Sequence, residues 1–179
     1  MTKSEFRSKS LSTLRAIGKS KARWYDHHIV QELWRLVREA HATSIMLYVP
    51  LGLEPDIMPL IATLRKYGMR VYVPFMEGES FRLVQYRLPL KIKKYGVREP
   101  NNSYKYRARK IDIAIVPIVG TDRKHRRIGF GKGMYDRFFA NEKNNIGHIV
   151  FVQRRLMCYP GIVSDPWDIV ADEIICASL

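Results

Sequence analysis

Cysteine is scarce in this chain of 179 residues, which contains only Cys158 and Cys176. Neither residue belongs to a C-x-x-C pair, and neither lies beside a histidine at zinc-ligand spacing. The five histidines likewise form no spacing that is typical of a catalytic or zinc site. We therefore interpret both thiols as structural rather than metal-binding.

Long apolar runs are also missing. The longest ones, such as Ile113 to Val119, are far shorter than the ~20 residues needed to cross a bilayer. Residues Met1 to Ser10 alternate between basic and polar types and lack the apolar core of a secretory signal. We therefore expect no membrane partner and a cytoplasmic location. We also expect a monomer, although the sequence itself does not fix the oligomeric state.

Acidic residues are few beside the basic ones: 17 Asp and Glu against 31 Lys and Arg give a formal net charge of +14 at pH 7. Such a charge favours anionic partners, among them nucleoside triphosphates. No RNP, helix-turn-helix or zinc-finger pattern accompanies it, so we expect only nonspecific binding of nucleic acid. The alternative is a solvated basic surface without a partner. The basic residues gather in four clusters: Lys19 to Arg23, Lys91 to Lys94, Lys105 to Lys110 and Arg123 to Arg127.

A strand-helix-strand pattern begins at residue 44. Ser44 to Val49 is a short apolar run, and Met69 to Pro74 is a second one. Between them apolar residues recur at helical spacing, with Pro55 suited to the first helical position and Gly68 to the C-terminal cap. Asp56 then falls in the first turn, where the helix dipole favours a carboxylate. Units of this kind build parallel sheets.

The remaining periodic segments extend this pattern into a single domain over residues 1–179. Its composition, 46% hydrophobic with 27% charged residues, is that of an ordinary globular protein. We predict an α/β fold with a mostly parallel sheet flanked by helices on both faces. Leu88 to Ala108 is expected to be a long, partly irregular loop. The other expected elements are helices at Lys3 to Ile17, with a Thr2–Glu5 capping box, and Trp24 to Ala40, and strands at Ser80 to Arg87, Ile111 to Val119, Ile146 to Val152 and Ile174 to Ala177.

The segment from Arg127 to Arg137 carries the strongest chemical signal. Gly129, Gly131 and Gly133 alternate with other residues, so several backbone N–H groups can converge on an anion. The helix that follows directs its positive end to the same place, and Arg127 and Lys132 add charge. The pattern is neither a Walker A loop nor G-x-G-x-x-G. A glycine-rich turn that only allows tight strand-helix packing is the alternative.

Two further features have both a functional and a structural interpretation. Lys3 and Arg7 are one helical turn apart, so they form either a two-cation clamp or two solvated charges. Asp136, just inside the predicted helix, is either a hard oxygen ligand for a cation or a carboxylate that complements the helix dipole.

Five ordered segments resemble the 5-formyltetrahydrofolate cyclo-ligase family, also called methenyltetrahydrofolate synthetases. The most specific one is Arg-x-Gly-Phe-Gly-Lys-Gly-x-Tyr-Asp-Arg-Phe, and together they span nearly the whole chain. Met134 stands where the family usually has an aromatic residue, and Trp167 stands where it usually has histidine. The matching segments are Lys3-x-x-x-Arg7, Leu51 to Asp56, Gly96 to Pro100, Arg127 to Phe138 and Trp167 to Asp172.

The resemblance implies an enzyme that uses ATP and Mg²⁺ to convert 5-formyltetrahydrofolate to 5,10-methenyltetrahydrofolate. It assigns catalysis to Arg127, Lys132 and Asp136, and the Mg²⁺ site to Asp136 and Asp168. It assigns ATP binding to Lys3, Arg7, Arg127, Ile128, Gly129, Phe130, Gly131, Lys132, Gly133, Met134 and Tyr135. It assigns folate binding to Leu51, Glu54, Asp56, Phe130, Gly131, Lys132, Gly133 and Met134. A relative that binds nucleotide, folate or nucleic acid without turnover is the alternative.

Overall fold

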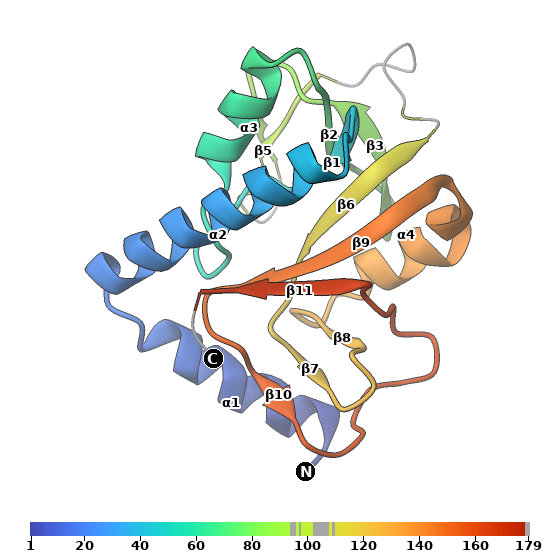
Figure 1. The fold of residues 1–179 in the computed structure, drawn as a ribbon. Helices are drawn as coiled ribbons and strands as arrows, with labels where there is room; N and C mark the ends of the chain where they lie inside the picture. The colour runs from blue at the N-terminus through green and yellow to red at the C-terminus, as the bar shows by residue number, and fades with distance from the viewer. Residues whose placement is uncertain (94–95, 97, 102–107, 109, 178–179) are drawn as a thin grey trace.

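The computed structural model describes residues 1–93, 96, 98–101, 108 and 110–177. A six-stranded sheet forms the centre, in the order β11-β9-β6-β1-β2-β3 (Figure 1). The last pair, β2 and β3, is antiparallel, and the four other pairs are parallel. The mostly parallel sheet predicted from the sequence is therefore confirmed. The strands are β1 (Ser44–Met46), β2 (Arg70–Glu77), β3 (Ser80–Gln85), β6 (Ile111–Pro117), β9 (Ile146–Gln153) and β11 (Glu173–Cys176).

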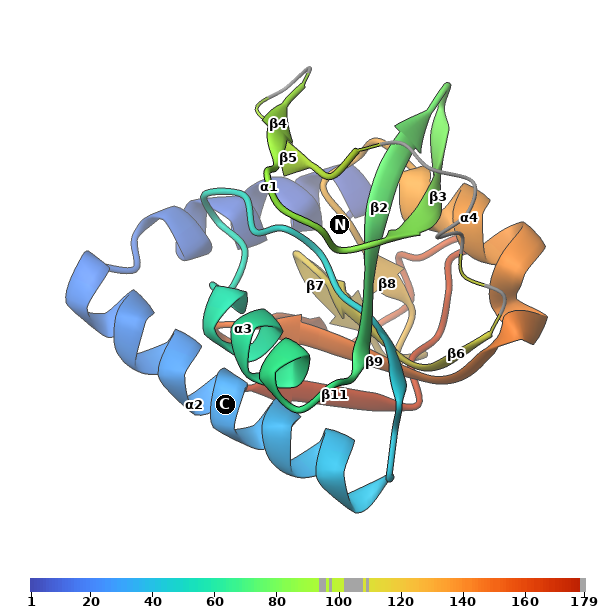
Figure 2. The same cartoon turned by 90° about the horizontal axis from the view of Figure 1, so that it is seen from above.

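Helices cover both faces of this sheet, as predicted. Figure 2 shows α2 (Lys19–Glu39) and α3 (Met58–Lys66) on one side, and α4 (Met134–Glu142), which runs into a short 3₁₀ turn, on the other. Strand β6 feeds both cores because successive side chains of a strand point to opposite faces. Ile113 and Ile115 join the core under α2 and α3, whereas Ala114 and Val116 join the core under α4. No helix in the described ranges is long and apolar enough to span a membrane.

Helix α1 (Lys3–Arg15) packs on a second, smaller sheet that the sequence did not predict. Its strands lie in the order β10-β7-β8, with bounds Cys158–Tyr159, Gly120–Asp122 and Arg127–Ile128. The predicted capping box is confirmed: Thr2 accepts from the Glu5 N–H group, and the Glu5 carboxylate accepts from the Thr2 N–H group. A Cβ atom on Gly120 would lie 2.7 Å from the Phe6 ring, so glycine is needed for the close approach of α1.

Helix α3 begins later than predicted. It starts at Met58, and Pro59 occupies its first turn in place of Pro55. Both prolines suit a first helical turn, but Pro55 is buried in the preceding loop, where its carbonyl accepts a 2.9 Å hydrogen bond from the Tyr48 hydroxyl. Asp56 therefore lies ahead of the helix, and its Oδ1 atom accepts from the Met58 N–H group at 3.0 Å. Gly68 follows the helix with φ +75°, as its predicted capping position requires.

Two other boundaries differ from the prediction. Helix α2 begins at Lys19, five residues before the expected Trp24, because its first turn is basic and polar and carries no apolar periodicity. Within the stretch expected to be an irregular loop, β4 (Lys91–Ile92) and β5 (Arg98–Glu99) pair as a short antiparallel ladder. Residues 94, 95, 97 and 102–107 of that stretch lie outside the described residues, as does residue 109. Parts of the basic clusters Lys91 to Lys94 and Lys105 to Lys110 therefore also lie outside them.

Candidate active site

The predicted site residues gather at the edge of the sheet where the parallel strands end. Residues 47–57 follow β1, residues 118–133 follow β6, and residues 154–172 follow β9. Ligands of open α/β sheets bind at this edge, because the connecting loops converge there. Helix α1 brings Lys3 and Arg7 to two of these loops, where Lys3 contacts Asp165 and Arg7 contacts Gly129.

The glycine-rich loop runs from the end of β8 to the start of α4. Gly131 and Gly133 have φ values of +98° and +62°, a backbone region that favours glycine. Gly133 is the N-cap residue of α4, so the loop leads directly to the positive end of that helix. Phe130, Gly131 and Lys132 are exposed, so this part of the loop faces solvent. Anion binding by this loop stays a prediction, for which the loop has a suitable backbone and exposure.

Arg127 is the buried centre of the site, with 5% of its surface exposed. Its Nε and Nη2 atoms donate to the carbonyl oxygen of Pro117 at 3.2 and 3.0 Å, and its guanidinium lies 4.6 Å from the centre of the Tyr135 ring. A Cβ atom on Gly129 would lie 2.1 Å from Arg127 Nη1, so the loop packs directly against the guanidinium. The first glycine therefore serves packing, although against a guanidinium and not between a strand and a helix as the alternative had it.

Carboxylates from three parts of the chain lie close enough to the Arg127 guanidinium to affect its pKa. Burial lowers the pKa of Arg127, and the nearby negative charges oppose that shift. The group remains a cation, as arginine does throughout proteins. The charges that oppose the shift include those of Glu54, Asp136 and Asp168. The structure thus brings together residues that the sequence assigned to the folate and metal parts of the site.

Lys3 and Arg7 hold two different parts of the site. Lys3 Nζ lies 2.8 Å from Asp165 Oδ2 and 2.5 Å from Asp168 Oδ2. Arg7 Nε donates to the carbonyl oxygen of Gly129 at 2.8 Å. The interpretation of both residues as merely solvated charges is therefore wrong, because each one has a defined partner at the site.

Glu54 links the loop after β1 to the buried centre. Its Oε2 atom accepts from the Leu51 N–H group at 2.8 Å, and 9% of the residue is exposed. Burial raises the pKa of Glu54 to about 7, although the Leu51 hydrogen bond and the charges of Arg127 and Arg154 act in the opposite direction. Leu51 and Asp56, the other predicted folate residues of this loop, are exposed on either side of Glu54.

The two carboxylates predicted to hold Mg²⁺ differ in their surroundings. Asp136 Oδ1 is buried and has no hydrogen-bond partner among the described residues. Asp168 is 4% exposed, and its Oδ2 atom accepts from Lys3 and from the Asp165 N–H group. No cluster of three or more possible protein ligands occurs in the described part of the chain. An orphaned carboxylate oxygen suits Mg²⁺, which takes one or two carboxylates and completes its shell with substrate phosphates and water.

The structure adds positioning residues that the sequence analysis did not identify. Arg154 binds both carboxylate oxygens of Asp26 at 2.7 and 2.9 Å and donates to the Leu53 carbonyl at 3.3 Å, which ties the loop after β1 to α2. Arg137 donates to the carbonyls of Lys132 and Glu79 and so ties the glycine-rich loop to the turn after β2. Arg137 belongs to the glycine-rich motif, but nothing local in the sequence distinguishes Arg154.

Asp122 is another buried carboxylate that the sequence analysis missed. It accepts from the N–H groups of Lys124, Val163 and Ser164 at 2.9 to 3.0 Å. Burial alone would raise its pKa, but these hydrogen bonds outweigh burial and lower the pKa to about 2. Asp122 thereby fixes the segment that leads to Asp165 and Asp168. Its signal in the sequence is weak, because it lies in a turn beside several basic residues.

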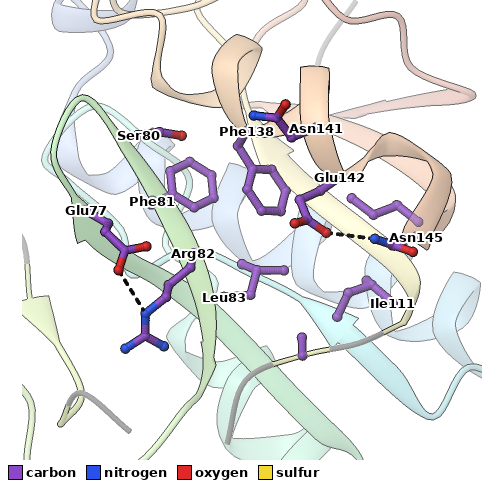
Figure 3. Close-up of a pocket in the computed structure, with 12 residues that line it drawn as sticks. Glu77, Ser80, Phe81, Arg82, Leu83, Ile111, Phe138, Asn141, Glu142 and Asn145 are labelled. Atoms are coloured by element: carbon purple, nitrogen blue, oxygen red, sulfur yellow. Dashed lines mark hydrogen bonds and ion pairs between the residues drawn. The ribbon is translucent and has the colours of Figure 1, made fainter. Parts of the chain in front are cut away.

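A cavity of about 230 Å³ lies at the other end of α4 and is separate from this site. Figure 3 shows Phe81 and Phe138 in its wall, together with the Glu77–Arg82 ion pair and the Glu142–Asn145 hydrogen bond. Ile111 and Ile146, the first residues of β6 and β9, also line it. The cavity therefore opens near the amino ends of these strands, and the glycine-rich loop does not line it.

The fold and the site together define a class of protein. A glycine-rich loop at the carboxyl edge of a parallel sheet is typical of α/β enzymes that handle phosphate groups. So are a buried arginine and a buried carboxylate oxygen that has no hydrogen-bond partner among the described residues. The match to a family model is more specific. The model of the 5-formyltetrahydrofolate cyclo-ligase family matches residues 1–177, and the chain belongs to this family of ATP-dependent ligases.

Individual relatives agree with this assignment. The chain is 24% identical over 157 residues to the 5-formyltetrahydrofolate cyclo-ligase of Haemophilus influenzae, and the match covers 84% of each chain. It is 27% identical over 144 residues to that of Mycolicibacterium smegmatis, covering 74% of this chain and 72% of that one. The NMR structure of Aquifex aeolicus 5,10-methenyltetrahydrofolate synthetase has a TM-score of 0.82 at 27% identity, covering 99% of this chain and 90% of that one.

Proposed function

We propose that the protein converts 5-formyltetrahydrofolate to 5,10-methenyltetrahydrofolate, using ATP with Mg²⁺ and releasing ADP and phosphate. Family membership supports the reaction, and the arrangement of the site supports the roles of its residues. The single observation that carries the proposal is the position of Arg7 and Arg127 against Gly129, the first glycine of the glycine-rich loop. Two cations therefore lie beside a backbone suited to phosphate.

The chemistry explains why these residue types are needed. A formamide carbonyl is a poor electrophile, and its oxygen is a poor leaving group. Transfer of the γ-phosphoryl group of ATP to that oxygen yields ADP and an activated imidate on N5. N10 then attacks the formyl carbon, the bond from this carbon to the phosphorylated oxygen breaks, and phosphate and the N10 proton leave. Phosphoryl transfer depends on positioning and on neutralisation of charge, so no nucleophilic side chain is required.

Each predicted residue has a role in this scheme. Lys3, Arg7 and residues 127–135 bind ATP, with Arg127 and Lys132 placed to neutralise charge on the transferred phosphoryl group. Leu51, Glu54 and Asp56 bind the folate from the loop after β1, and Phe130 to Met134 also face it. Asp136 and Asp168 hold Mg²⁺, which when bound offsets the negative charge of the phosphates. The buried Oδ1 atom of Asp136 supports this role.

Absorbance of the methenyl product tests the proposal. The purified protein is incubated with 5-formyltetrahydrofolate and Mg²⁺, with and without ATP, beside an established cyclo-ligase as positive control. We expect product only when ATP is present, with one ADP released per methenyl group formed. Binding of both substrates without product would instead support a relative that binds its ligands without turnover.

A further inference from the structure

A basic cavity lies where α1 and α2 meet, at the elbow that Figure 1 shows between the two helices. Its volume is about 360 Å³, and its lining includes Ser12, Thr13, Lys21, Tyr25 and Arg155. None of these residues belongs to the predicted ATP, folate or metal sites. The cavity therefore needs an explanation of its own.

The charged residues that line this cavity, Lys21 and Arg155, are both basic. The first turn of α2 contains no acidic residue, and its N-cap residue, Gly18, supplies no side-chain hydrogen bond to the helix. The first acidic residue of α2 is Asp26, and both of its carboxylate oxygens accept hydrogen bonds from Arg154. No ion pair in the described ranges involves Lys21 or Arg155. The cavity consequently attracts an anion that can use cationic and hydroxyl donors.

An aromatic surface adjoins the cavity. Trp24 is 61% exposed, and its ring lies 5.5 Å from that of Tyr25, which lines the cavity. The His28 ring lies parallel to the indole within 7°, at a centroid distance of 6.1 Å. Lys21 Nζ lies 5.5 Å from the centre of the Tyr25 ring. Trp24 and Lys21 are three positions apart on α2, so the exposed indole and the ammonium group are neighbours on one surface of the helix.

We propose that this elbow binds single-stranded nucleic acid, with a backbone phosphate in the cavity at Lys21 and Arg155 and a base stacked on Trp24. A groove that tracks phosphates beside exposed aromatic rings is the combination that recognises single strands. An acidic peptide would satisfy the charges but would leave the indole without a flat partner. A duplex would satisfy the charges too, but its bases are stacked on one another and do not reach Trp24. The net charge of +14 adds long-range attraction for such a strand.

Fluorescence anisotropy with short labelled uridine and thymidine oligonucleotides tests the proposal. The salt dependence of binding separates phosphate contacts from base stacking. We expect Trp24→Ala to weaken binding at least about fivefold at every salt concentration, as the loss of one stacked base does. We expect Lys21→Ala to lower the slope of log affinity against log salt by about one, because one phosphate contact is lost.

Matched controls come from α3 and the residue that follows it. Tyr67→Ala removes another exposed aromatic residue, which is 65% exposed, and Lys66→Ala removes another exposed cation. Both controls should bind like the unmodified protein. Equal losses in the Trp24 and Tyr67 variants would overturn the proposal, and so would equal affinity for a duplex. Displacement by polyglutamate that is insensitive to Trp24→Ala would point instead to an acidic protein partner. Since the elbow lies outside the predicted active site, these outcomes are independent of the cyclisation assay.

Discussion

The Nε atom of Arg7 donates a 2.8 Å hydrogen bond to the backbone carbonyl of Gly129, a residue 122 positions later in the chain. This contact holds Gly129, the first glycine of the glycine-rich loop, against helix α1. We expect Arg7→Met to raise the KM for ATP about tenfold, because a charge-assisted hydrogen bond contributes about 1.5 kcal/mol or more. Steady-state kinetics with varied ATP measures the effect. Lys9→Met, an exposed position on the same helix, is the control and should leave KM unchanged.

Gly129→Ala tests the packing of the loop against Arg127. The new Cβ atom would meet a guanidinium that cannot withdraw, since it is bonded to Pro117 and packed on Tyr135. We expect a loss of about 1–3 kcal/mol in the free energy of unfolding, measured in urea, together with a higher KM for ATP. Gly52→Ala is the control for stability, because nothing lies within 4 Å of the added atom. Equal stability of the two variants would contradict the packing role.

Asp136→Asn tests the predicted metal site. The substitution keeps the shape of the side chain but removes the charge of a carboxylate whose Oδ1 atom is buried without a partner among the described residues. We expect the Mg²⁺ concentration for half-maximal rate to rise at least about tenfold, and chelation of the metal to abolish turnover in the unmodified protein. Glu142→Gln, at the far end of the same helix, is the control. An unchanged Mg²⁺ requirement in the Asp136 variant would remove this residue from the metal site.

Glu54→Gln tests the pH dependence of folding. The carboxyl group of Glu54 has a pKa of about 7 in the folded protein, against 4.5 for an ordinary glutamate. Between these values the folded state binds more protons than the unfolded state, so this group lowers stability as pH rises from 4.5 to 7. The accumulated loss is about 3 kcal/mol above pH 7.

The Glu54→Gln variant has an amide in place of the carboxyl group, so it does not ionise over this pH range. Urea denaturation at pH 5 and pH 8 should therefore show that it gains stability relative to the unmodified protein as pH rises. A constant difference between the two proteins over that interval would show that Glu54 titrates normally in the folded state.

Some parts of this fold follow from local sequence and others do not. The Thr2–Glu5 capping box and the Gly68 cap are contained in a few neighbouring residues, and the structure confirms both. The start of α3 is different, because Pro55 and Pro59 satisfy the same local rule. Only the burial of Pro55 and its bond to Tyr48 separate them.

The site shows the same division. The glycine-rich motif indicated phosphate binding because its glycines and basic residues are neighbours in the sequence. By contrast, the partner of Lys3 at Asp165 lies 162 positions away, and no spacing rule predicts it. The motif identifies Arg127 as a site residue, but it does not predict that this side chain is buried, which follows from its place in β8. Contacts between distant segments decide which charges become buried.

The two ion pairs of Lys3 join residues that lie 162 and 165 positions apart in the chain. Helix α1, which lies outside the central sheet, thereby supplies the cation that faces the buried carboxylate of Asp168. Loss of this helix would remove Lys3 from that carboxylate, so this corner of the pocket depends on how firmly α1 is held against the small sheet.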